Sequence, residues 1–153
     1  MKADLRVAPA PPRTTAPGGS PARLPGSDVP ADGWTWRSPG GKLLSAAVGA
    51  AAFGTGVALG GVVSWPFWAA LVAPDLAFLH KGATPPAGPG HVSPETVRVY
   101  NTLHDPRLAV GLVAAGALTA SRPLLLAGLG WTTHIAVDRA FGFGTRRPDG
   151  AIH

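Results

Sequence analysis

Four apolar runs, separated by short polar or Pro-rich segments, organise the chain. The first, residues 43–65, carries no charged side chain, and a helix of that length measures roughly 34 Å, enough to cross the hydrocarbon layer of a membrane. The other runs cover residues 66–79, 108–120 and 124–141, and the third is long enough only if its helix begins before Pro106. We therefore predict an all-α fold, an integral membrane four-helix bundle in contact with the lipid bilayer.

The segments that flank these runs have a different composition. Residues 1–40 hold eight of the 17 prolines, and their few large apolar side chains cannot offset the entropy lost when a chain is ordered. We predict that residues 1–40 form a disordered Pro/Ala/Gly-rich tail, that residues 41–145 form the four-span transmembrane domain, and that residues 146–153 form a short basic C-terminal tail.

Small residues in the first run suggest close helix packing. Gly56 and Gly60 are separated by three residues, a spacing that lets the backbone of another helix approach closely. We interpret this spacing first as packing within one chain, and the alternative is the contact face of a homo-oligomer.

The charges set an orientation. Only 14% of the residues are charged, and there is no basic stripe interleaved with aromatic residues, so we predict no nucleic-acid partner despite the net charge of +5. Cysteine is absent, which excludes thiolate chemistry. On one side of the predicted bundle lie eight Lys and Arg residues near the helix ends: Arg37, Lys42, Lys81, Arg98, Arg107, Arg139, Arg146 and Arg147. The other side has only Arg122, which predicts a multi-pass protein of the inner (plasma) membrane with both termini cytoplasmic.

With this topology, four ionisable side chains share one depth near the cytoplasmic face. They are Asp75, His104, His134 and Asp138, and ionisable groups at such depths need partners. A supporting polar cluster is expected from Tyr100, Asn101 and Arg139, because these residues neighbour the four on their helices.

Three interpretations of this constellation stay open. The primary one is an interhelical structural clasp, in which Asp138 or Asp75 pairs with Arg139 and the histidines bond to backbone. The second is a site for a divalent metal such as zinc, held by Asp75, His104, His134 and Asp138, in a membrane-embedded hydrolase-like enzyme acting on a membrane-associated substrate. The third is a proton or small-solute transporter.

Three motifs in the chain resemble those of a known family. They are Pro-Asp-Leu at residues 74–76, Tyr-Asn-Thr-Leu-His at residues 100–104, and Trp-Thr-Thr-His-Ile-Ala-Val-Asp-Arg-Ala-Phe-Gly-Phe-Gly at residues 131–144. Over about residues 36–145 the chain resembles the domain-of-unknown-function family 4260 of small multi-span bacterial membrane proteins. It departs from the family pattern at residues 145–147, which read Thr-Arg-Arg where Leu-Lys-Tyr is usual. The resemblance implies the membrane topology and the importance of these positions, and it implies no activity.

Overall fold

A computed structural model describes residues 35–80 and 82–152 of the chain. Of the tail predicted over residues 1–40, residues 1–34 lie outside this description. Its last two residues already belong to the first helix, which begins at Pro39.

The described residues are helical. They form five α-helices and two 3-10 helices: α1 (Pro39–Ala58), η1 (Gly61–Val63), α2 (Trp65–Val72), η2 (Ala73–Leu79), α3 (Pro94–Leu103), α4 (Pro106–Leu118) and α5 (Arg122–Phe141). Among the described residues the only strand-like pairing is an isolated bridge between Arg146 and Ile152. The predicted all-α class is confirmed.

Prolines set the helix boundaries, because proline fits the first turn of a helix and interrupts its interior. All five α-helices have a proline in the first turn. Before Pro106 the chain breaks into two helices, and the Asp105 side chain accepts a hydrogen bond from the Arg107 backbone N–H at 2.9 Å. The helix of the third apolar run therefore begins at Pro106, and not before it as a full span of that run requires. The second apolar run also changes form near Pro74, where α2 gives way to η2.

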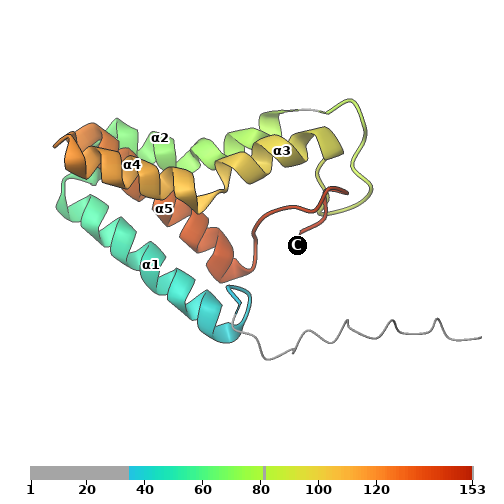
Figure 1. Cartoon of the computed structure of the whole chain (residues 1–153), viewed down its shortest axis with the longest axis horizontal. Coiled ribbons are helices and arrows are strands. Elements are labelled where there is room, and N and C mark those ends of the chain that lie inside the picture. The colour runs from blue at the N-terminus through green and yellow to red at the C-terminus, as the bar shows by residue number, and fades with distance from the viewer. Residues whose placement is uncertain (1–34, 81, 153) are drawn as a thin grey trace, which may run out of the picture. The chain divides into compact units, whose positions relative to one another are not determined.

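Helix α5 occupies the centre of the bundle. Helices α1, α2 and α4 all pack against it, and α3 packs against η2 beyond the end of α4 (Figure 1). The apolar core between α1, α2 and α5 contains Ala52, Phe67, Leu126 and Leu129, and Phe67 is fully buried. Helix α5 also contacts η2, which carries Asp75.

Glycines allow these close approaches. A Cβ atom on Gly56 would overlap the ring of Phe67, and one on Gly130 would overlap the Phe67 backbone carbonyl. Gly60 adopts a positive φ of 79° and lies beside the Arg122 guanidinium, which donates to the Leu59 carbonyl. Gly56 therefore permits a close contact with Phe67 of α2, and Gly60 permits the turn that follows α1.

One helix among the described residues, α1, has both the length and the apolar composition needed to cross a membrane. Only 22% of its most apolar window is buried within the protein, so it is not a core helix enclosed by its neighbours. The segment Trp65–Leu79, which joins α2 and η2, is apolar but shorter.

Candidate functional site

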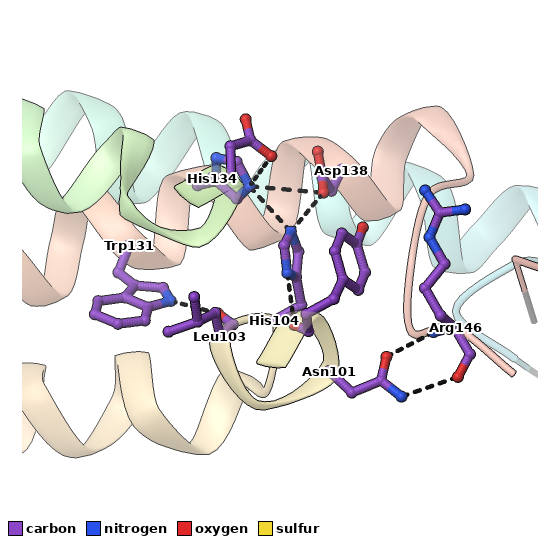
Figure 2. A network of polar contacts seen from close by, with 9 residues as sticks. Asn101, Leu103, His104, Trp131, His134, Asp138 and Arg146 are labelled. Carbon is purple, nitrogen blue, oxygen red and sulfur yellow. Dashed lines mark hydrogen bonds and ion pairs between the residues drawn. The ribbon is translucent and has the colours of Figure 1, made fainter. Parts of the chain in front are cut away.

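Three parts of the chain bring His and Asp side chains to one point. Asp75 lies in η2, His104 caps the C-terminus of α3, and His134 and Asp138 lie one turn apart on α5. Figure 2 shows the two imidazoles directed toward each other, with Asp138 beside them. The break before Pro106 contributes to this meeting. Helix α3 ends at Leu103 and α4 begins at Pro106, so His104 lies in the junction between two helices.

The donor atoms of the cluster lie within a few ångströms of one another. The Nε2 atoms of His104 and His134 are 3.3 Å apart. One carboxylate oxygen of Asp138 lies 3.3 Å from His104 Nε2 and 3.6 Å from His134 Nε2. An oxygen of Asp75 lies 3.7 Å from His134 Nε2. The donor atoms of Asp75, His104 and His134 all lie within 4.8 Å of one another.

The backbone orients one of the imidazoles. His104 Nδ1 lies 2.9 Å from the carbonyl oxygen of Tyr100, and a carbonyl oxygen only accepts, so Nδ1 carries the proton of this hydrogen bond. The neutral ring then presents an unprotonated Nε2 to His134 and Asp138. A backbone carbonyl that fixes the tautomer in this way is the usual outer partner of a metal-binding histidine.

Burial is graded across the cluster. The His104 side chain is 3% exposed and that of His134 is 9% exposed, whereas Asp138 is 22% and Asp75 is 56% exposed. The histidines therefore form the floor of the site and Asp75 forms its open edge.

The cluster fits a divalent cation in chemistry and in size. Zinc binds imidazole nitrogen at about 2.0–2.1 Å, so two such ligands at the corners of a tetrahedron lie about 3.3–3.4 Å apart. Four of the six pairs among these side chains lie 3.3–3.7 Å apart, close to this edge, and the donor atoms of Asp75, His104 and His134 lie within 4.8 Å of one another. Two carboxylates and two neutral imidazoles carry a charge of −2, and among the described residues no Lys or Arg forms an ion pair with either carboxylate.

Tyr100 supports the cluster from below. Its ring stacks on that of His104 with centroids 3.8 Å apart and an interplanar angle of 15°. The Tyr100 side chain is buried, and this burial is the main reason that the pKa of its hydroxyl is raised; the nearby negative charge of Asp138 adds to the effect. The hydroxyl thus stays protonated, and the ring holds His104 in place.

The structure does not bring Asn101 and Arg139 to this cluster, where the sequence predicted them. The Asn101 amide exchanges two hydrogen bonds with the backbone of Arg146, at 2.9 and 2.7 Å. The Arg139 guanidinium lies over the ring of Trp36, 5.8 Å from its centroid. The aspartates that the clasp would pair with Arg139 are therefore paired with histidines instead.

Two residues that position the site were not predicted from the sequence. The Trp131 indole on α5 donates to the Leu103 carbonyl at 2.8 Å, which ties the end of α3 to α5. Arg146 is only 8% exposed and lies over the Tyr100 ring, 5.0 Å from its centroid. Trp131 stands three residues before His134, which was the one signal of its role; Arg146 gave no local signal.

Comparison with known families gives one match. The model of the family described as Domain of unknown function (DUF4260) matches residues 42–153. Neither a curated protein nor a solved structure has detectable similarity to the chain. The match includes all four residues of the cluster.

Proposed function

Because the chain belongs to the domain-of-unknown-function family DUF4260, whose description assigns no activity, we propose a function from the site itself: an integral membrane protein that binds one divalent metal ion through Asp75, His104, His134 and Asp138. The observation that carries this proposal is the position of His134 Nε2, which lies 3.3 Å from His104 Nε2, 3.6 Å from an Asp138 oxygen and 3.7 Å from an Asp75 oxygen, while His104 Nδ1 is occupied by a backbone carbonyl.

The membrane setting is supported by apolar side chains that no other part of the described chain covers. They occur on α1, η1, α2, η2, α4 and α5, and the large exposed ones include Leu43, Val57, Val63, Trp65, Leu76, Leu79, Val110, Leu118 and Phe141. Soluble monomers rarely expose contiguous apolar surface of this extent. Lipid would cover these faces, with α1, α2 continued by η2, α4 and α5 as the four crossings and the amphipathic α3 outside the apolar layer. Because α4 has only 13 residues, about 20 Å, the apolar layer would thin around it.

The proposed side of the membrane follows from the charges beside the helices. Arg122 is alone at the end where α4 joins α5, and its guanidinium is used to cap the α1 carbonyl of Leu59. Lys42 and Arg139 lie at the opposite end, near the last turn of α5. The excess of cations on that side supports a position of the cluster near the cytoplasmic face.

The number of protein ligands decides what a bound metal would do. Four protein ligands close a zinc site, which is typical of structural metals, whereas three leave a position for water, which is typical of hydrolytic sites. Asp75 is the most exposed of the four and lies farthest from His134. In the open form, Asp75 would leave the metal and a water molecule would take its place.

The structural clasp is the second candidate. The same distances between the histidines and the aspartates are compatible with hydrogen bonds if a proton, and not a metal ion, lies between the side chains. A protonated His134 would direct its Nε2 proton at His104 Nε2, beside the carboxylates of Asp138 and Asp75, which lie 3.6 and 3.7 Å from the same nitrogen. A transport function has less support, because the Thr132 and Thr133 hydroxyls donate to carbonyls of their own helix and line no polar route.

Metal analysis of the purified full-length chain tests the proposal. We expect close to one zinc or other divalent ion per chain after loading and buffer exchange, and loss of that ion in His134→Ala. His91→Ala is the matched control, because this loop histidine bonds to the nearby Pro89 carbonyl and is not part of the cluster. Equal metal content in the wild type and His134→Ala would overturn the metal site and favour the clasp.

A further inference from the structure

A second site lies outside the metal cluster. Helices α1 and α4 each pack on α5, and between them runs a groove of about 230 Å³. Its walls are apolar: Leu44 and Val48 from α1, Ala109 and Val110 from α4, and Ile135 and Ala136 from α5. These α5 residues lie on a different side of the helix from His134 and Asp138, so the groove is separate from the cluster.

The groove has one polar end. Trp36 and Arg139 both line it, and the Arg139 guanidinium lies 5.8 Å from the centre of the Trp36 ring. Arg37 lies over the same ring at 4.9 Å. Among the described residues no carboxylate forms an ion pair with Arg139. Within residues 35–80 and 82–152, the half-buried Arg139 thus has donors that no carboxylate pairs with, and an anion from outside the chain can bind to them.

We propose that this groove binds an anionic phospholipid, with one acyl chain along the apolar walls and the phosphate at Arg139. The apolar walls of the groove and the positive charge at its one polar end favour a phospholipid as the ligand. A lipid carries a long apolar chain joined to an anionic group, and the groove pairs apolar walls with arginines at one end. Trp36 stands at the level where tryptophan occurs at membrane interfaces, and guanidinium is the preferred partner of phosphate oxygens.

The inference rests on the proposed membrane setting but not on the metal. It assigns the protein a lipid headgroup class, since a phospholipid with a net negative charge should be held more tightly than a zwitterionic one. One arginine or lysine near an anionic lipid headgroup increases the affinity for that lipid by about fivefold.

Native mass spectrometry of the full chain in detergent tests the site, with phosphatidylglycerol and phosphatidylcholine of the same acyl chains as probes. We expect the wild type to retain phosphatidylglycerol about fivefold better, and Arg139→Gln to lose this preference. Arg98→Gln, on the exposed face of α3, removes the same charge and should keep it. A preference retained in Arg139→Gln, or lost equally in Arg98→Gln, would overturn the proposal.

Two further experiments test whether the lipid occupies the groove and whether a phosphate without an acyl chain can bind in its place. Val48→Trp fills the apolar part and should reduce retention of both lipids, whereas Val137→Trp, on an exposed face of α5 that does not line the groove, should not. Glycerol phosphate, which offers the phosphate without an acyl chain, should not displace the lipid, and effective competition would refute a lipid site. The metal content of Arg139→Gln should equal that of the wild type, so a failed metal site and a failed lipid site are distinguishable.

Discussion

The Nε2 atoms of His104 and His134 face each other at 3.3 Å, although thirty residues separate them in the chain. Two unprotonated ring nitrogens repel at this distance, so a cation or a proton must lie between them. If the cation is a metal ion, the cluster is a metal centre; if it is a proton, the cluster is a structural clasp. Substitution of Asp138 can distinguish the two, because its carboxylate lies beside both rings.

Asp138→Asn keeps the shape of the side chain and removes its charge. We expect metal affinity, measured by competition with a chelating dye, to fall by at least about tenfold, the lower end of what even the loss of an outer partner costs. Asp149→Asn, at an exposed aspartate near the C-terminus, is the control for charge.

The same variant separates the two candidate functions when metal is removed. When a chelator has removed the metal, Asp138→Asn should have the same free energy of unfolding as the wild type, because the carboxylate then has no metal to bind. A loss of about 1–3 kcal/mol in the free energy of unfolding, the cost of breaking a buried polar contact, would instead identify the carboxylate as part of a structural clasp.

Gly130→Ala should destabilise the bundle, because its new methyl group meets the Phe67 carbonyl. Overpacking of this kind costs about 1–3 kcal/mol. Gly54→Ala is the matched control: it is also a helical glycine, but nothing lies within 4 Å of its added Cβ, so it should be neutral or slightly stabilising through helix propensity. Thermal unfolding in one detergent, followed by circular dichroism, compares the two; similar melting temperatures would contradict the close approach of α2 to α5.

Asn101→Ala should release the C-terminal segment. The Asn101 amide satisfies both the N–H and the carbonyl of Arg146, and leaving buried backbone groups without partners costs about 1–3 kcal/mol. Hydrogen exchange at the Arg146 amide should accelerate, while Thr102→Ala, at an exposed neighbour whose hydroxyl bonds within α3, should leave it unchanged. Unaltered exchange in Asn101→Ala would show that Arg146 is held by its guanidinium alone.

Glu95 should make the loop before α3 sensitive to acid. The Thr84 hydroxyl and backbone N–H donate to one Glu95 oxygen at 2.6 and 3.3 Å, and the hydroxyl bond is the main cause that lowers the carboxyl pKa below its ordinary 4.5. A lowered pKa means that this tether is fully present above pH 4.5 and is lost as the pH falls through the folded-state value. Limited proteolysis between pH 6 and pH 3 should reveal loop opening that is absent in Glu95→Gln, where cleavage should not vary with acid.

Local signals in the sequence account for several helix boundaries. Pro94 lies in the first turn of α3, and the proline at 106 separates α3 from α4, because proline geometry acts on neighbouring residues. The meeting of His104 with His134 and Asp138 also followed from their common depth in the predicted bundle.

Long-range side-chain directions were not accessible in the same way. Asn101 lies three residues before His104, which places it near the same side of a helix, yet its amide turns toward Arg146 forty-five residues later. Likewise Arg139 follows Asp138 directly but lies over Trp36. Helical spacing restricts which neighbours a side chain can reach, and the choice among them depends on distant segments that the local pattern does not encode.

The break between α3 and α4 has a consequence for how the protein is made. Asp75 and His104 emerge during synthesis before α5, which carries His134 and Asp138. Until α5 has been synthesised and has packed, the early pair lacks the partners His134 and Asp138, and its polar atoms keep their hydrogen bonds to water. The packing of α5 is thus the step that completes the cluster, so the four side chains can meet only after the last helix has formed.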